Sequence, residues 1–315
     1  MKEFIRKLFW GSTEITEYST VTVEGAIREQ VFFETGSFTI NVSDAHWVLC
    51  LEPVVFGVWV KRHENVIISQ ETKCSLCFCS YKPKNEVRPG RDAVAVVTLE
   101  YLDKVEDPGG TLYLLKQKKS RLYHVNFLKT LVLFFKYYKK PKWPFAKYKA
   151  LVAAYSFPRR VRVVSVSCDG YFNIFPMDLL GEIPHSGKYV FGLRHTNVAL
   201  SKIVEGAKVV VSEVPFIYKE AIYGLGKHHG STPPSPGSLP FTLQTTENFK
   251  SLVPAWAEGY KEITILTTKD LGSHRLLWGE VVGEKKLEEG QGNLYHVHFL
   301  LYYHQKLRGT AYRVV

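Results

Sequence analysis

The chain has 315 residues, of which 45% are hydrophobic and 14% aromatic, and its formal net charge at pH 7 is +11. This composition excludes a disordered chain and is typical of a globular protein with a sizeable core, in one large domain or two ordinary ones. No run of 18 apolar residues occurs, and residues 1–19 lack the apolar core of a signal peptide. We therefore expect neither a membrane-spanning helix nor secretion.

The five cysteines are an odd number in a long chain, which is not typical of a secreted disulfide framework, so we expect a cytoplasmic protein. Cys74, Cys77 and Cys79 form the motif CSLCFC. A tetrahedral zinc site usually needs a second ligand pair, and the sequence shows none at a suitable distance. Cys77 and Cys79 would share one face of a strand, so we interpret them as small buried hydrophobes and predict no metal site.

Short β-strands are predicted throughout the first part of the chain. Several runs are rich in β-branched and aromatic residues and are bounded by turn residues, which is the composition of strands. They lie at residues 20–23, 26–33, 37–41, 54–61, 73–80, 93–99 and 112–117.

Residues 116–149 are the most biased segment, because they hold eleven Lys or Arg and no Asp or Glu. The net charge of the whole chain is also +11, so the remainder is neutral by count and the basicity is local. Interleaved aromatic and basic residues attract nucleic acid phosphates or an anionic membrane surface. The other interpretation is a final strand and a helix with a solvated cationic face, and no known nucleic-acid-binding motif accompanies the segment.

The chain repeats short motifs in the same order in its two halves. LYHVNFL at residues 122–128 recurs as LYHVHFL at 294–300, with six identities in seven. Four shorter matches pair 18–19 with 155–156, 36–38 with 170–172, 55–57 with 190–192, and 62–66 with 194–198. Five matches in order favour duplication over chance. We predict two similar domains, 1–149 and 150–315, in which 122–128 and 294–300 lie in equivalent strands.

The second half adds an insertion at residues 223–257. It contains GKHHGSTPPSPGSLP, a Gly-, Pro- and Ser-rich loop, followed by a weakly helical patch. Long loops on barrels are commonly functional or mobile.

Residues 170–214 have the outline of an anion site. Two predicted strands, 171–175 and 188–193, are followed by the run Arg194, His195, Thr196 and Asn197 at the start of a helical pattern, and then by an apolar strand. Free N–H groups at a helix N-terminus suit an anion, and Arg, Thr and Asn add donors. A strand, a capped helix and an exposed Arg is the alternative interpretation.

This stretch resembles the flavin reductase-like proteins, which have the FMN-binding split β-barrel. In that family an Asn-containing strand and loop lie along the isoalloxazine, an Arg-x-Thr-like turn lies near the phosphate, and an apolar strand follows. Here these are residues 173–178, 194–197 and 208–214. GSHRLLWGEVV at 272–282 is similar to the family's Gly-Asp-His…Gly-Glu-Val segment, with Ser273 in place of Asp. The resemblance covers residues 150–312 and implies a mainly β fold of two split barrels with a few short helices.

The resemblance implies that the second domain binds FMN or FAD and reduces it with NAD(P)H. Arg194 would bind phosphate oxygens bidentately, and residues 175–177 would offer apolar surface to the ring. Because the flavin carries the hydride chemistry, we expect no acid–base dyad. The predicted cofactor-binding residues are Asn173, Phe175, Pro176, Met177, Asp178, Arg194, His195, Thr196, Asn197 and Lys227, and those predicted to meet the nicotinamide are His274, His228 and His229.

The first domain departs from this pattern where it would bind flavin. Glu64 stands where the second domain has Thr196, and a carboxylate repels a phosphate dianion. We therefore expect a first domain that does not bind flavin. Proteins of this family are typically homodimers with flavin at the subunit interface, so the chain would be a pseudo-dimer, or a homodimer, whose first domain supplies the second wall of the site.

Three functions remain open from the sequence. The first is an oxidoreductase resembling NAD(P)H:flavin reductases, with an acceptor protein or monooxygenase as partner. The second is a non-catalytic split-barrel module that holds flavin or haem. The third is a catalytically silent interaction protein that uses the basic segment.

Overall fold

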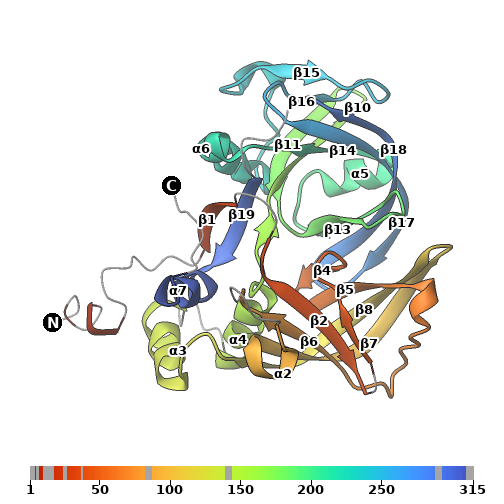
Figure 1. Cartoon of the computed structure of the whole chain (residues 1–315). Helices are drawn as coiled ribbons and strands as arrows, with labels where there is room; N and C mark the ends of the chain where they lie inside the picture. Colours follow the sequence, from red (N-terminus) through yellow and green to blue (C-terminus); the bar gives the residue numbers. More distant parts are fainter. Residues whose placement is uncertain are drawn as a thin grey trace.

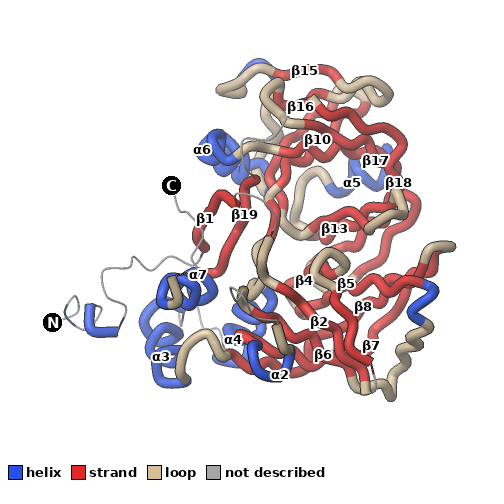
Figure 2. Tube along the Cα trace, in the orientation of Figure 1, coloured by secondary structure: helices blue, strands red, loops and turns tan. Residues whose placement is uncertain are grey.

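The computed structural model describes residues 4, 7–9, 18–23, 27–36, 38–81, 87–138, 144–287 and 293–309. Two seven-stranded antiparallel sheets form the centre of the fold (Figures 1 and 2). The first sheet contains β2 (Gln30–Thr35), β3 (Phe38–Asn41), β4 (His46–Leu51), β5 (Val54–Lys61), β6 (Cys74–Cys79), β7 (Ala93–Asp107) and β8 (Gly110–Leu122). The second contains β10 (Arg162–Cys168), β11 (Tyr171–Met177), β12 (Leu180–Ile183), β13 (Lys188–Arg194), β14 (Lys208–Glu213), β17 (Gly259–Asp270) and β18 (His274–Lys286).

The two sheets have the same topology. Their strand orders are β3-β2-β6-β7-β8-β5-β4 and β11-β10-β14-β17-β18-β13-β12. If the strands of each sheet are numbered from one to seven along the chain, both orders read 2-1-5-6-7-4-3. The predicted mainly β fold with two barrel-like sheets and short helices is confirmed.

The sequence predicts six of the seven strands of the first sheet and misses β4, and in the second sheet it treats β12 as loop. The predicted ends at residues 26 and 37 lie outside the described residues. Both missed strands occupy the same edge position of their sheets, next to β5 and β13. Residues 46–50 of β4 are all buried, so the strand has no alternation of apolar and polar residues by which to recognise it.

The prediction that residues 122–128 and 294–300 lie in equivalent strands is wrong. Leu122 ends β8, and α3 (Phe127–Leu133) begins five residues later, whereas residues 293–298 form a separate strand, β19 (Asn293–His298). This strand forms because its backbone pairs on both sides, with β1 (Tyr18–Val23) and with β9 (Arg159–Arg160). The motif marks a helix start in both halves, since Asn126 caps α3 and His298 caps α7 (Phe299–Leu307).

Each sheet encloses its own apolar core. The second sheet curls around α5 (Leu200–Gly206), whose Leu200 and Ile203 pack among Val164, Phe175 and Phe191 (Figure 1). In the first half, the short helix η1 (Arg62–Glu64) stands between the corresponding strands, and Val66 and Ile68 fill the core.

A third apolar cluster joins the two sheets. It is made by Trp47, Leu49, Cys50, Val55, Trp59, Leu112 and Leu114 from the first sheet and by Ile183, Val190, Leu271, Leu276 and Trp278 from the second half. The closest approach is made by β4, because a Cβ on Gly192 would lie 2.0 Å from the Leu49 carbonyl oxygen. Only glycine fits there, so the backbones of β4 and β13 are in direct contact.

The basic segment forms the end of β8, then α3, a π-helical turn η2 (Phe134–Tyr138), and α4 (Phe145–Ala154); residues 139–143 lie outside the described chain. The predicted domain boundary at 149/150 lies inside α4. These helices share a core with α7, built by Leu133, Phe134, Tyr148, Val152, Phe299, Leu300 and Tyr303. Among the described helices, none is long and apolar enough to cross a membrane.

The insertion covers one side of the second sheet. Its elements, with those before it, are η3 (Phe216–Tyr218), α6 (Lys219–Gly224), η4 (Leu225–His229), η5 (Pro236–Ser238), β15 (Leu243–Thr245) and β16 (Leu252–Pro254). The weakly helical patch predicted near its end is wrong, because β15 and β16 pair as a hairpin that packs Leu243 and Leu252 against Phe172 and Ile174. A further short helix is α2 (Pro89–Asp92). Cys74, Cys77 and Cys79 are buried in β6.

Candidate functional site

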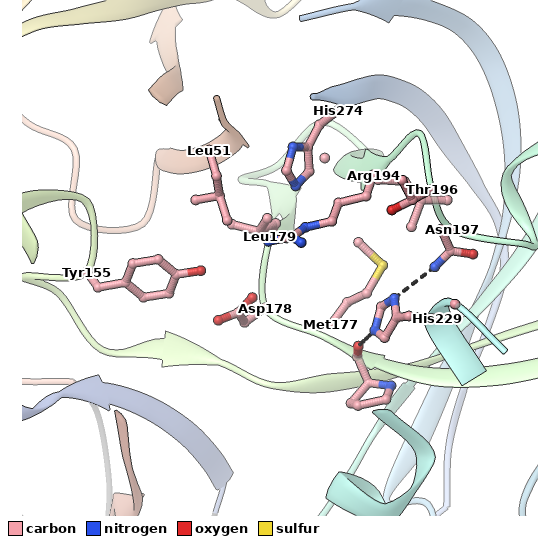
Figure 3. A pocket seen from close by; sticks show the side chains of 14 residues that line it. Leu51, Tyr155, Met177, Asp178, Leu179, Arg194, Thr196, Asn197, His229 and His274 are labelled. Atoms are coloured by element: carbon pink, nitrogen blue, oxygen red, sulfur yellow. Dashed lines mark hydrogen bonds between the residues drawn. The ribbon is translucent and has the colours of Figure 1, made fainter. Parts of the chain in front are cut away.

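A cavity of about 540 Å³ lies between the end of β11, the end of β13, η4 and the end of β4 (Figure 3). This volume lies in the range that holds small-molecule ligands and cofactors. The residues that line it are Leu51, Tyr155, Pro176, Met177, Asp178, Leu179, Gly192, Leu193, Arg194, Thr196, Asn197, His229, Gly230 and His274. Eight of the thirteen residues predicted from the sequence are among them, namely Pro176, Met177, Asp178, Arg194, Thr196, Asn197, His229 and His274.

Arg194 is the last residue of β13, and its side chain extends into the cavity toward Leu179 (Figure 3). The pairing of β13 with β18 sets Arg194 opposite His274. Within the described chain, the Arg194 guanidinium makes neither a hydrogen bond nor an ion pair. A guanidinium with its donors unused is a ready partner for a phosphate or carboxylate, which it binds bidentately.

His229 forms part of the cavity wall and uses both ring nitrogens. Its Nε2 lies 2.7 Å from the carbonyl oxygen of Pro176, which can only accept, so Nε2 carries the proton. Its Nδ1 then accepts from the Asn197 amide at 2.8 Å, while the Asn197 oxygen accepts from the backbone N–H of Ala199. Burial lowers the pKa of His229, in accord with a neutral ring. His229 therefore has no free ring nitrogen for a substrate.

Hydrogen bonds from Glu52, in the first half of the chain, fix the position of Ser273 beside His274. The backbone N–H of Ser273 donates to the Glu52 carbonyl at 2.7 Å, and the Glu52 N–H donates to the Ser273 hydroxyl oxygen at 3.1 Å. The hydroxyl hydrogen is therefore available to His274 Nδ1, which lies 2.8 Å away. When the hydroxyl donates to Nδ1, the ring proton lies on Nε2.

Nε2 of His274 is a buried ring nitrogen without a hydrogen-bond partner among the described residues. The side chain is only 1% exposed, and it lines the cavity. Burial, reinforced by the nearby charges of Arg194 and His195, lowers the pKa of His274 to about 4. The ring is thus a neutral N–H donor at pH 7, and a ligand acceptor in the cavity would relieve its unmet hydrogen bond.

This lowered pKa predicts a pH-dependent stability. Between pH 6.5 and 4 the unfolded chain binds a proton on residue 274 that the folded chain does not, so stability falls as the pH falls through this window. We expect His274 alone to lower the free energy of unfolding by about 2 kcal/mol between pH 7 and pH 5. Urea unfolding at both pH values tests this, with His274→Gln as the comparison. A variant whose loss between the two pH values equals that of the unmodified chain would contradict it.

Asp178 brings a negative charge to the same cavity. Burial alone would raise its pKa, but the hydrogen bond from His296 Nδ1 at 2.8 Å and the charge of Arg159 outweigh burial, so the pKa is lowered. His296 in turn stacks on Tyr223, with ring centroids 5.3 Å apart. The cavity therefore presents a carboxylate at Asp178, a guanidinium at Arg194 and apolar surface between them (Figure 3).

Five of the predicted site residues do not line the cavity. Asn173 is fully buried, and its amide donates to the carbonyl of His228, which fastens η4 to β11. The Phe175 ring packs on His229 with centroids 4.7 Å apart, so it supports the wall from behind. His195 turns toward Asp270 at 3.4 Å, Lys227 is exposed, and His228 is buried away from the cavity.

Sequence reasoning missed six lining residues, and two of them, Leu51 and Tyr155, precede the second sheet in the chain. Leu51 ends β4 of the first sheet, and Tyr155 follows α4. The sequence predicts that the first domain forms a wall of the site, but no motif identifies which residues form it.

A second cleft, of about 720 Å³, occupies the corresponding place in the first half. In the first sheet Gly57 pairs with Leu114, and in the second sheet the equivalent Gly192 pairs with Leu276. Two residues further along each strand, Trp59 therefore takes the place of Arg194. Its partner Leu112 takes the place of His274. The sequence alignment of Arg62 with Arg194 is therefore three residues out of register. Glu64, which also lines this cleft, accepts a hydrogen bond from the Lys61 backbone at 2.8 Å.

Comparisons with known proteins give structural matches alone, since no family model and no curated protein matches the chain. The NADH:FAD oxidoreductase SgcE6 of Streptomyces globisporus is 17% identical with a TM-score of 0.43, over 47% of this chain and 88% of that one. BorF, the flavin reductase component of a bacterial two-component tryptophan halogenase, is 12% identical with a TM-score of 0.40, over 46% and 93%. An FMN-binding protein from Thermus thermophilus is 19% identical with a TM-score of 0.38, over 42% and 74%.

Proposed function

We propose that this chain binds FMN or FAD in the cavity between Arg194, His274 and Leu51, and that it reduces the flavin with NADH or NADPH. One observation carries the proposal. An arginine side chain without a described partner and a buried, unpaired imidazole N–H line the same cavity as a band of apolar side chains. A flavin has an anionic phosphate, a polar ring edge and a flat apolar ring, so it matches each of these features.

Six of the cavity residues have a proposed role in holding the flavin. Arg194 binds phosphate oxygens, and Thr196 adds a neutral donor. Met177, Leu193 and Leu51 offer apolar surface that excludes water from the ring. The neutral His274 donates from Nε2 to an acceptor on the flavin edge or on the nicotinamide amide. The flavin itself supplies the hydride chemistry when it is bound.

The two halves have different proposed tasks. We assign flavin binding to residues 150–315, while the first 149 residues position His274 through Glu52 and close the cavity with Leu51. In the corresponding cleft of the first half, Trp59 stands in the place of Arg194, and the Glu64 carboxylate lines the cleft together with the cations Arg28 and Lys61. The reduced flavin would serve an acceptor protein or a monooxygenase.

A haem-binding module is the poorer fit to this cavity. An axial histidine ligand presents an unprotonated ring nitrogen to the metal. With the Ser273 hydroxyl donating to Nδ1, His274 keeps its proton on Nε2, and both nitrogens of His229 are already used.

The absorbance spectrum of the purified chain, before and after addition of FMN, tests the proposal directly. We expect a bound flavin spectrum whose bands bleach when NADH or NADPH is added without oxygen. Bound flavin that neither nucleotide reduces would leave a non-catalytic flavin-binding module. A chain that binds no flavin would exclude both functions.

His274→Ala is expected to lower turnover with NADH or raise its KM by about tenfold, because one buried hydrogen bond to the second substrate is lost. The Kd of flavin should change by less than about threefold, since the phosphate contact remains. Steady-state kinetics beside a flavin titration measure both quantities. Ser273→Ala is the matched control, because it keeps the imidazole ring but removes the hydroxyl that hydrogen-bonds to Nδ1. We expect it to change the turnover or KM less than His274→Ala does. If His274→Ala instead loses flavin, the residue binds the cofactor.

A further inference from the structure

The cavity lining contains one pair of opposite charges. Among the described residues that line it, Arg194 is the one cation and Asp178 the one anion, because burial lowers the pKa of His229 and His274 and keeps both rings neutral at pH 7. Figure 3 shows both charged side chains at the cavity. In the proposed function Arg194 pairs with the flavin phosphate. The described lining then holds no second cation to balance the Asp178 carboxylate.

The Asp178 carboxylate is fixed in place and ionised. Its side chain is 15% exposed, and Oδ2 accepts a hydrogen bond from His296 Nδ1 at 2.8 Å. The His296 ring stacks on Tyr223, with an angle of 22° between the ring planes. Burial would raise the pKa of Asp178, but His296 and the charge of Arg159 outweigh burial and lower it. Arg159 does not line the cavity, so it offsets part of the negative charge from outside.

The charge of Asp178 acts across the cavity. Burial has the largest effect on the pKa of His274 and of His229, and the charge of Asp178 acts on both in the opposite direction. His274 begins β18 and His229 ends η4, so the two rings belong to different parts of the wall. A flat ring that binds between them lies within range of the same charge. A site that excludes water screens that charge little.

Reduction changes the charge of the flavin ring and leaves the phosphate as it was. The hydride that NADH gives up carries two electrons and one proton, and it forms an N–H bond on the ring while NADH becomes NAD⁺. The neutral oxidised ring thereby gains one negative charge, which it keeps until a second proton arrives from water. A fixed carboxylate repels the anionic ring but does not repel the neutral one.

We propose, on the basis of the function proposed above, that the Asp178 carboxylate makes the cavity bind oxidised flavin more tightly than reduced flavin. Reduced flavin then leaves the cavity and carries its electrons to the acceptor by diffusion. The flavin is therefore a substrate that turns over, and not a permanently bound group. By linkage, a tenfold difference between the two Kd values lowers the two-electron potential of the bound flavin by about 30 mV.

Equilibrium dialysis without oxygen, with FMN and with dithionite-reduced FMN, measures both Kd values. For the unmodified chain we expect the Kd of reduced FMN to be at least about tenfold higher than that of oxidised FMN. Because the reductant is dithionite and not NADH, the ratio of the two Kd values can be measured even in a chain that does not use the nucleotide. The ratio is the relevant quantity, since repulsion between Asp178 and the phosphate acts in both redox states.

Asp178→Asn removes the charge but keeps the size of the side chain and a hydrogen-bonding oxygen. It should lower the ratio of the Kd values by about tenfold and raise the potential of bound FMN by about 30 mV. Asp178→Glu keeps the charge, so most of the discrimination should remain.

Asp270→Asn is the matched control. The Asp270 side chain is 62% exposed, pairs with Arg275 and does not line the cavity, so its charge is screened by water. The substitution should change the ratio of the Kd values by less than about twofold. Thermal unfolding of each variant checks that the fold is intact.

Two results would overturn the proposal while leaving flavin reduction in place. The first is a folded, unmodified chain that binds both redox states with equal Kd, and this measurement decides even if Asp178→Asn does not fold. The second is a folded Asp178→Asn variant whose ratio equals that of the unmodified chain. An equal fall of the ratio in Asp270→Asn would assign the effect to overall charge and not to Asp178. A chain that binds flavin in neither state would exclude the proposed function together with this role of Asp178.

Discussion

Replacing Arg194 and Thr196 by alanine is expected to raise the Kd of FMN by roughly 30- to 1,000-fold. The estimate follows from the loss of two contacts to phosphate, one of them charge-assisted, which together stabilise binding by about 2 to 4 kcal/mol. The Arg194 guanidinium has no described partner that the substitution would also disrupt, so the fold should be little affected. Titration of flavin fluorescence measures the effect.

The pair Arg62→Ala and Glu64→Ala is the matched control in the first half. Among the described residues, the Arg62 guanidinium donates only to the carbonyl of Asp107, at 3.5 Å, and Glu64 caps the turn after β5. These substitutions should change the Kd of FMN by less than about twofold, since the proposed site lies in the second half. Equal weakening by the two pairs would show that the flavin site has been assigned to the wrong residues.

The sequence predicts strands well where they alternate in polarity and fails where they do not. The strand β2 has an alternating pattern of burial, and the sequence predicts it. The strand β4 is instead buried at all of residues 46–50, because the first sheet covers one of its faces and the second sheet covers the other. A strand buried on both faces carries no periodicity that a local reading can detect. The sequence indicates that two barrels exist. The strand β4 that joins them can be recognised only in the folded structure, where both barrels pack against it.

The candidate site likewise contains some residues that the sequence predicts and others that it cannot predict. Arg194, Thr196 and Asn197 could be found because a turn with donors before an apolar helix is a local pattern. Leu51 and Tyr155 could not be found, since they reach the cavity from other parts of the fold. The roles of the ring nitrogens of His229 and His274 were also hidden, because they depend on bonds to Pro176, Asn197 and Ser273 that only the structure shows.

Gly192→Ala is expected to lower the free energy of unfolding by about 3 kcal/mol or more. The new Cβ would lie 2.0 Å from the carbonyl oxygen of Leu49 and 2.8 Å from its Cα, so the clash is with backbone. Gly192 is also held in place by its own N–H, which donates to the carbonyl of Leu179 at 2.7 Å. Relief of this backbone clash requires the two strands to separate, so β4 must move away from β13.

This movement should affect the cavity as well as stability. Leu49 is the bulged residue of β4, at the register shift between its neighbours, and Leu51 lines the cavity two residues further along the same strand. Displacement of β4 therefore withdraws the wall that the first half supplies. We expect Gly192→Ala to weaken flavin binding too, although Gly192 carries no side chain that could contact the ligand.

Gly57→Ala is the matched control, because Gly57 holds the corresponding position in β5. Its Cβ would meet the Leu49 Cδ1 at 2.6 Å, which is the rotatable end of a side chain, so a cost of about 1 kcal/mol is expected. Urea unfolding followed by tryptophan fluorescence reports on this interface, since Trp47, Trp59 and Trp278 all belong to it. Equal costs for the two substitutions would contradict the backbone contact, and a new unfolding step in Gly192→Ala alone would show that β4 couples the two barrels.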